Sequence, residues 1–168
     1  MGAVIGHEIT HGFDDEGAQF DDEGNLKNWW SLSTEEHFTN RSQCFVEQYG
    51  SINDTRVNLL LNGRNTLGEN IADNGGIREA FRAFQSSRRD ALLPGLNYSR
   101  EQLFFISYAN TWCSLTRTEK LRQSILYDPH SPPKYRTNIP LANYHEFSRV
   151  WNCPKESPME NKEPCVLW

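Results

Sequence analysis

The sequence lacks a long hydrophobic run and any cluster of basic residues. None of its apolar stretches approaches the roughly 20 residues that a membrane-spanning helix needs. The formal net charge is −5, which argues against nucleic acid or an anionic membrane as a partner. Only five residues separate Met1 from His7, too few for a secretory signal peptide. A chain of 168 residues is long enough for one domain with a core and short for two.

Cysteine is scarce and follows no metal-binding spacing. The four cysteines are Cys44, Cys113, Cys153 and Cys165. Their even number and the absence of a Cys-x-x-Cys pair favour disulfides over a thiolate zinc site. Three acceptor sequons for N-glycosylation begin at Asn40, Asn53 and Asn97. Together these features predict an extracellular or cell-surface protein.

A motif near the N-terminus, His7-Glu-Ile-Thr-His11, has the spacing of a metal site. Residues four apart share one face of a helix, here predicted over 2–13, so both imidazoles can bind one metal ion about 2 Å away. Glu8 lies one step round the helix, where a metallopeptidase keeps its general base. Asp14 and Asp15 follow one turn later as candidate partners of a ligand imidazole, or as a solvated helix end. The alternative for the motif is a polar helix.

A second informative stretch runs from Thr66 to Gly76. Asp73 follows Glu69 by four residues, so a carboxylate ligand and a carboxylate that orients a ligand histidine share one helix face. Alternatively, Thr66 and Glu69 form a capping box. The pair Gly75-Gly76 destabilises a helix by about 2 kcal/mol relative to two alanines, and such a pair usually marks close approach of another backbone.

The remaining segments predict further helices. Ser33 to Glu36 reads as a capping box with Ser33 as the N-cap, opening a helix that ends at Gly50. That helix has one apolar stripe, formed by Phe38, Ser42, Phe45 and Tyr49. The segment 103–115 is apolar nearly all round, which predicts a buried helix. The pair Trp29-Trp30 is expected to pack as a core anchor, and 51–65 to form a surface connection.

A proline-bounded loop covers 128–136. A histidine in such a loop is by default a surface residue, and an arginine nearby is usually a solvated charge. The loop by itself therefore does not predict a functional role for His130 or Arg136; such a role has to be inferred from the rest of the sequence.

The His7–His11 motif, the segment 68–76 and the terminal Cys165-x-x-Trp168 together resemble the neprilysin family of zinc metallopeptidases, which includes the endothelin-converting enzymes. The resemblance covers the whole chain and matches the C-terminal catalytic part of much longer proteins. It implies a mainly α fold, the C-terminal helical part of a thermolysin-like (gluzincin) catalytic domain. Residues 1–168 would form a single partial catalytic domain, a fragment whose upstream lobe is missing.

The resemblance also implies residue roles. One zinc ion (Zn²⁺) would be bound by His7, His11 and Glu69. Glu8 would be the general base, and Asp73 would orient His7 and, in family descriptions, donate a proton.

Further roles concern the substrate. His130 resembles the histidine that hydrogen-bonds the tetrahedral oxyanion, with Asp128 holding its ring, and Arg136 resembles the arginine that grips a substrate carbonyl. Val4 and Trp112 match positions that line the family's apolar substrate pocket.

The cysteines fit the resemblance in part. Cys44 and Cys165 correspond to a family disulfide, whereas Cys113 and Cys153 correspond to cysteines that pair with upstream partners. The family's Asn-Ala segment, which hydrogen-bonds the substrate backbone, is also missing.

The implied function is a zinc-dependent metalloendopeptidase that hydrolyses extracellular oligopeptides on the amino side of hydrophobic residues. Family members are typically type II membrane proteins or secreted. The alternative is a truncated, non-catalytic fragment that keeps a structural zinc site or acts as an interaction module. A structural site would recruit a fourth protein ligand, whereas a catalytic site leaves that position open. A third reading is a helical domain without metal.

Overall fold

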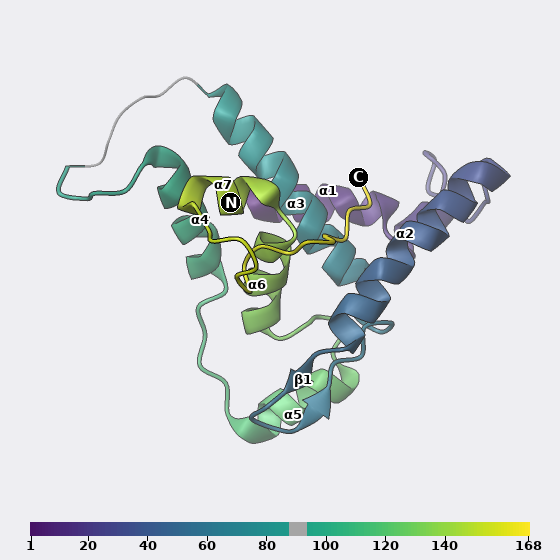
Figure 1. Cartoon of the computed structure of the whole chain (residues 1–168). Coiled ribbons are helices and arrows are strands. Elements are labelled where there is room, and N and C mark those ends of the chain that lie inside the picture. Colours follow the sequence, from purple (N-terminus) through teal and green to yellow (C-terminus); the bar gives the residue numbers. More distant parts are fainter. Residues whose placement is uncertain (88–93) are drawn as a thin grey trace.

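The computed structural model describes residues 1–87 and 94–168, and in these the chain is mainly helical, as predicted (Figure 1). The α-helices are α1 (Gly2–Thr10), α2 (Leu32–Gly50), α3 (Leu67–Ser86), α4 (Arg100–Thr111), α5 (Thr118–Tyr127), α6 (Pro133–Ala142) and α7 (His145–Trp151). Two single-turn 3₁₀ helices, η1 (His11–Phe13) and η2 (Gly17–Gln19), follow α1. No helix among these residues is both long and apolar enough to cross a membrane.

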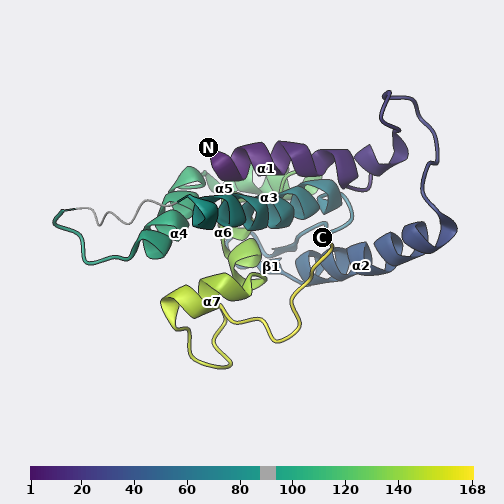
Figure 2. The same ribbon diagram turned by 90° about the horizontal axis from the view of Figure 1, so that it is seen from above.

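Helix α1 lies along α3, and glycines permit the contact (Figure 2). A Cβ atom added at Gly76 would lie 2.5 Å from the His7 backbone nitrogen, and one added at Gly6 would lie 2.8 Å from the Gly76 carbonyl oxygen. Because backbone cannot yield as a side chain can, only glycine fits at this crossing. The close approach predicted from Gly75-Gly76 is therefore confirmed, and it brings the histidine motif against the start of α3.

The buried apolar side chains form two clusters. One joins α2, the N-terminal half of α3, α5 and the tail, and includes Phe45, Tyr49, Ile71, Ile125 and Leu167. The other joins the C-terminal half of α3 to α4, α6 and α7, and includes Ile77, Phe81, Phe105, Leu141 and Tyr144. Helix α3 contributes to both clusters, so its position is fixed along its length.

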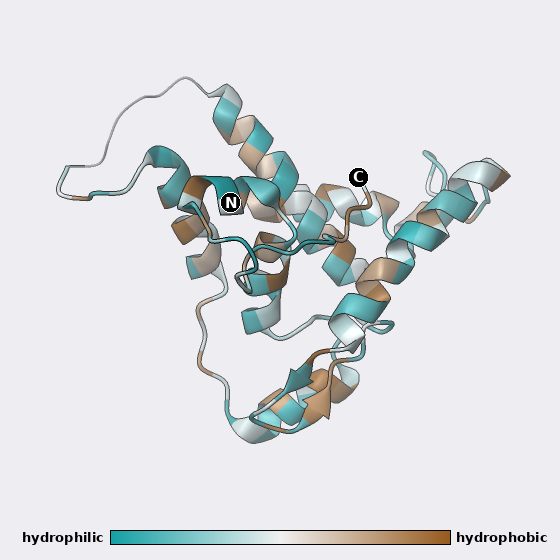
Figure 3. Cartoon of the chain, viewed as in Figure 1, coloured by the Kyte–Doolittle hydropathy of each residue, from teal (hydrophilic) through white to brown (hydrophobic). Residues whose placement is uncertain are grey.

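The segment predicted as a surface connection folds into a small hairpin. Strands β1 (Asn53–Asp54) and β2 (Leu59–Leu60) pair antiparallel, with Asn53 opposite Leu60. Val57 and Leu61 from this region belong to the first core cluster, so the connection is partly buried. Figure 3 shows hydrophobic residues on the hairpin and on α5 where the two lie together.

Helix α2 buries the predicted stripe, but its N-cap is Ser31 and not Ser33. The Ser31 hydroxyl accepts a hydrogen bond from the Thr34 backbone N–H at 3.2 Å, and Leu32 is the first helical residue. Both serines stand in a Ser-x-Ser-Thr run, so the spacing alone allowed either start.

Two expectations of burial are wrong. Helix α4 is not buried all round, since Phe105 and Tyr108 are its buried side chains and others line a cavity. Trp29 is 48% exposed and contacts the half-buried Trp30 with the two rings tilted by 60°. In both places apolar side chains lie at the surface or line a cavity and are not part of the core.

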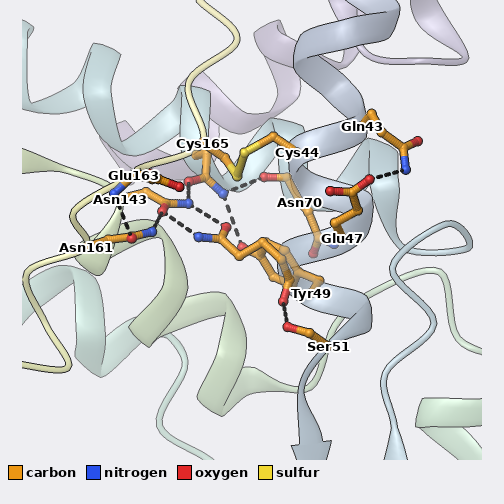
Figure 4. The surroundings of a disulfide bond; sticks show 12 residues. Gln43, Cys44, Glu47, Tyr49, Ser51, Asn70, Asn143, Asn161, Glu163 and Cys165 are labelled. Atoms are coloured by element: carbon orange, nitrogen blue, oxygen red, sulfur yellow. Dashed lines mark hydrogen bonds between the residues drawn. A yellow bond between two sulfur atoms is a disulfide. The ribbon is translucent and has the colours of Figure 1, made fainter.

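A disulfide joins Cys44 on α2 to Cys165 in the tail, the pairing that the family resemblance implied (Figure 4). Cys165 is 2% exposed and belongs to the first core cluster. Cys113 is exposed and Cys153 half-buried, and neither is in a disulfide. The bond fixes the end of the chain against α2.

Candidate metal and catalytic site

The three predicted ligands converge where α1 meets α3. His7 Nε2 lies 3.0 Å from His11 Nε2 and 3.2 Å from Glu69 Oε2, and His11 Nε2 lies 3.5 Å from Glu69 Oε1. One ligand atom from each residue lies within 4.8 Å of the others. Two imidazole nitrogens and a carboxylate oxygen facing one point form a donor set that zinc binds.

The second nitrogen of each histidine is held by a carboxylate. His7 Nδ1 lies 2.9 Å from Asp73 Oδ1, within ion-pair distance. His11 Nδ1 lies 2.5 Å from Asp14 Oδ2, and the other Asp14 oxygen accepts backbone N–H bonds from Glu16 and Gly17. Such partners favour the tautomer with the proton on Nδ1, leaving Nε2 as the donor to a metal. The residues present therefore fit a zinc ion.

Of the two acidic residues after His11, the structure places only Asp14 against the ring. Asp15 points elsewhere, with Oδ1 buried and without a hydrogen-bond partner among the described residues, and burial raises the pKa of its carboxyl. The capping-box interpretation of Glu69 is wrong: the Thr66 hydroxyl makes no cap and instead donates to the Asn62 carbonyl at 3.1 Å. Glu69 is therefore left to the site.

The electrostatics show a site crowded with interacting charges. Burial by itself lowers the pKa of His7, but its bonds to Asp73 and Glu69 and the charge of Asp73 outweigh this and raise the pKa to about 9. For Glu69, burial by itself raises the pKa, but the bond from His7 and the nearby histidine charges lower it overall. The carboxylates thus favour a positive charge between the two helices.

Arg136 is buried, so the expectation of a solvated arginine is wrong. Its side chain is bidentate on Asp73, with Nε 2.8 Å from Oδ2 and Nη2 2.9 Å from Oδ1. Its guanidinium carbon lies 3.9 Å from the centre of the Trp112 ring. The ion pair with Asp73 and the contact with the Trp112 ring compensate for the water that the buried guanidinium loses. They also hold it beside the candidate ligands.

His130 reaches the site from the loop before α6. Its Nδ1 lies 2.8 Å from Asp128 Oδ1, and its Nε2 lies 3.2 Å from Glu69 Oε1. A hydrogen bond from the His130 backbone, and then the His130 ring, hold the pKa of Asp128 below its usual value. The imidazole remains partly exposed, with 45% of the side chain accessible.

Glu8 and the pocket complete the arrangement. Glu8 is exposed on α1 next to His7, and it makes no side-chain hydrogen bond within residues 1–87 and 94–168. A cavity of about 650 Å³ opens between α1, α3 and α4. Its lining includes Val4, Asp73, Phe84, Phe104 and Trp112. The two predicted pocket residues thus line a mainly apolar cavity that reaches Asp73.

The modification candidates lie on the surface, since Asn40, Asn53 and Asn97 are all exposed. The sequence did not predict the pairing of Asp73 with Arg136, nor the buried side-chain amides of Asn70, Asn74 and Asn143. No local sequence pattern predicts either feature. Asp73 and Arg136 are 63 residues apart, and the asparagines stand in helix and loop segments of ordinary composition.

Comparison with known proteins finds relatives that align over the whole chain. The sequence model of peptidase family M13 matches residues 1–167. The chain is 46% identical to neprilysin-21 of Caenorhabditis elegans, with all of this chain and 23% of that protein aligned. It is 48% identical to an endothelin-converting enzyme homolog of Locusta migratoria, again with all of this chain and 23% of that protein aligned.

A solved structure shows the same fold. The crystal structure of a zinc metalloprotease of Mycobacterium tuberculosis in complex with an inhibitor superposes with a TM-score of 0.91 and 32% identity. The match covers 99% of this chain and 26% of that one. The chain therefore spans about a quarter of the length of the proteins it matches, and it belongs to peptidase family M13, a family of metallopeptidases.

Proposed function

We propose that this chain carries the zinc-binding and catalytic residues of a metalloendopeptidase that hydrolyses oligopeptides on the amino side of hydrophobic residues. The observation that supports this most directly is the convergence of His7, His11 and Glu69, with both far imidazole nitrogens held by carboxylates. These three residues would hold one zinc ion. As a Lewis acid, zinc would polarise the scissile carbonyl and make water more acidic.

The general base is Glu8. Glu8 directly follows His7 on α1 and is exposed, without a bond to any described side chain, so its carboxylate is free to accept a proton from the attacking water and to pass it to the leaving amine. Asp73 is engaged with His7 and Arg136 at once, an arrangement that suits orientation of both groups.

Two groups act on the substrate. His130 donates a hydrogen bond to the carbonyl oxygen as negative charge develops there, a contribution worth about 2.7–4 kcal/mol for one such donor in other enzymes. Arg136 binds a substrate carbonyl through the guanidinium edge that Asp73 does not occupy. The apolar cavity lined by Val4 and Trp112 receives the hydrophobic side chain that follows the cleaved bond.

The setting is extracellular or at a cell surface. A disulfide and three exposed sequons support this. In the whole protein, the part beyond this chain would complete the substrate cavity, and peptide substrates would bind between the two. Residues 1–168 would then be one partial catalytic domain of a larger peptidase.

The alternative is a structural zinc site. Such a site is closed by a fourth protein ligand. In the described part of the chain, the cluster with metal-binding spacing consists of three residues, which favours an open catalytic site.

The test is zinc analysis of the purified chain combined with a peptide-cleavage assay of Glu8→Gln. We expect about one zinc per chain in both proteins, and at least a roughly 100-fold loss of cleavage in the variant, since general acid–base groups contribute about 10²–10⁴-fold. Glu79→Gln, at an exposed position on α3, is the matched control and retains activity. Retained turnover in zinc-loaded Glu8→Gln would contradict the assignment of the base.

A further inference from the structure

The loop that carries His130 is fastened to α3 by a buried hydrogen bond that none of the roles above uses. The Ser131 hydroxyl donates to Asn70 Oδ1 at 2.8 Å, across 61 residues of sequence. Ser131 is 1% exposed and Asn70 0%. Each is the immediate neighbour of a site residue, Ser131 of His130 and Asn70 of Glu69. One side-chain hydrogen bond thus links the loop to α3 directly beside His130 Nε2 and Glu69 Oε1, which lie 3.2 Å apart.

The orientation of this bond is fixed by its surroundings. Asn70 Nδ2 donates to the Thr66 hydroxyl at 2.8 Å, and that hydroxyl donates to the Asn62 carbonyl at 3.1 Å. Because the single hydrogen of the Thr66 hydroxyl is used by Asn62, this hydroxyl can only accept from Asn70. The Asn70 amide therefore presents its oxygen to Ser131, and a flip would cost the Thr66–Asn62 bond. Because donor and acceptor are shielded from water, no solvent molecule replaces the bond if it breaks.

A second contact at the other end of the loop is weaker. Asn65 Nδ2 donates to the Asp128 carbonyl oxygen at 3.0 Å, and this contact is exposed. Water competes for an exposed hydrogen bond, so it contributes less to fixing the loop. Asp128 and His130 bond to each other inside the loop, which sets the ring relative to the loop but not relative to α3.

We propose that Ser131 and Asn70 are positioning residues that hold His130 beside Glu69, so that the imidazole stands ready where charge develops on the substrate. The inference rests on the proposed role of His130. A donor in an oxyanion site is effective only when it is already in place, and a displacement of about 1 Å lowers rates by up to about 100-fold. The two residues act through His130 and touch no substrate.

The first test needs neither metal nor activity. The imidazole signals of His130 in the metal-free chain are identified in NMR spectra by their absence from His130→Gln. In Ser131→Ala we expect them to shift and to approach those of the exposed His145, while the His7 signals stay in place. Ser42→Ala is the matched control, because it removes a buried hydroxyl that bonds locally to the Thr39 carbonyl. Unchanged His130 signals in Ser131→Ala would overturn the proposal.

The second test is a double-mutant cycle in the zinc-loaded chain. Ser131→Ala should lower kcat about tenfold with KM within about twofold, and Asn65→Ala should lower kcat by less than about threefold. In a His130→Ala background, Ser131→Ala should cause no further loss, because its effect passes through the missing ring. Ser131→Thr, which keeps the hydroxyl, should restore most of the rate. An equal loss in both backgrounds would show a merely structural role and contradict the proposal.

The two tests also separate this proposal from the proposed function. A folded chain that binds no zinc and cleaves no peptide would contradict the peptidase assignment. The NMR comparison would still decide whether Ser131 holds His130 against α3.

Discussion

Helix α3 presents two polar rows, one step apart on the helix, that behave in opposite ways. Glu69 and Asp73 face α1 and share their oxygens among histidines and Arg136. Asn70 and Asn74 face away from α1, where Asn74 donates to the Tyr49 hydroxyl and to the Asn70 carbonyl and accepts from Asn143 (Figure 4 shows Tyr49, Asn70 and Asn143). Asp73, Asn70 and Asn74 are all at most 3% exposed.

The two rows differ in what satisfies them. The amide row is neutral and complete within the protein, so it serves as a scaffold that fixes α3 against α2 and α6. The negative charges of Glu69 and Asp73 are neutralised by Arg136 and by histidines, and those histidines can bind either a proton or a metal ion. Changes in the amide row should therefore reduce stability, and changes in the charged row should alter how the protein responds to protons and metal.

The largest expected effect comes from separating α1 from the charged row. Gly76→Ala places a Cβ within 2.5 Å of the His7 backbone and 2.7 Å of the Ala3 carbonyl, so α1 must move away. We expect a loss of unfolding free energy of more than about 4 kcal/mol and a loss of zinc binding. Urea denaturation and zinc titration measure both. Gly50→Ala, whose Cβ would approach no backbone atom closer than 3.8 Å, is the control and should stay folded.

Next in size is a break in the amide row. Asn74→Ala removes three hydrogen bonds and leaves one buried N–H of the Asn143 amide unpaired, so we expect a loss of about 3 kcal/mol in urea denaturation. The folded fraction should keep its zinc affinity. Asn138→Ala, at an exposed position on α6, should change stability by less than about 0.5 kcal/mol. A stable Asn74→Ala variant with impaired zinc binding would reverse the roles of the two rows.

The charged row predicts a pH dependence of the metal-free chain. His7 has a pKa of about 9 when folded against 6.5 in its ordinary state, so its protonated form stabilises the fold. That contribution is complete below pH 6.5 and lost as the pH rises through 9, a decrease of at most about 3 kcal/mol in unfolding free energy. Denaturation at a series of pH values measures it. His7→Gln should abolish this slope, and an unchanged slope in that variant would assign it to another group.

The smallest effect lies outside both rows, at an exposed helix end. Ser31→Ala removes the N-cap of α2 and should lower stability by about 1 kcal/mol, whereas Ser33→Ala should have almost no effect. If Ser33→Ala lowers the melting temperature more than Ser31→Ala does, the N-cap is Ser33, as the sequence suggested. The difference in stability between these two variants measures what one solvent-exposed hydrogen bond contributes, for comparison with the buried amide bonds.

Sequence reasoning succeeded where a rule acts over a few residues. The i, i+4 spacing of His7 and His11 and the pair Gly75-Gly76 are local patterns, and the structure places both helices as those patterns predicted. The cap of α2 was wrong by two residues because several hydroxyls compete at its start. Local signals decide such boundaries only weakly.

Pairings between distant segments were beyond the sequence. Arg136 joins Asp73 across 63 residues, and Ser131 joins Asn70 across 61. Such bonds follow from how α6 and its preceding loop pack on α3, and no periodicity records that packing. For the same reason the local sequence alone favoured a solvated Arg136, although the family resemblance implied a role in substrate binding, and the fold places its guanidinium against the Trp112 ring.

The Cys44–Cys165 disulfide encloses some of the site residues in a covalent ring and leaves the others outside it. It closes a covalent ring with a sequence separation of 121 residues, which contains Glu69, Asp73, His130 and Arg136. The histidine motif lies outside that ring, so only the chain segment 12–43 and the non-covalent packing of α1 on α3 hold it in place. Native proteins open locally in units of unequal stability. We therefore expect α1 to open before the rest of the fold and to separate the candidate ligands, so hydrogen exchange should be faster in α1 than in the middle of α3.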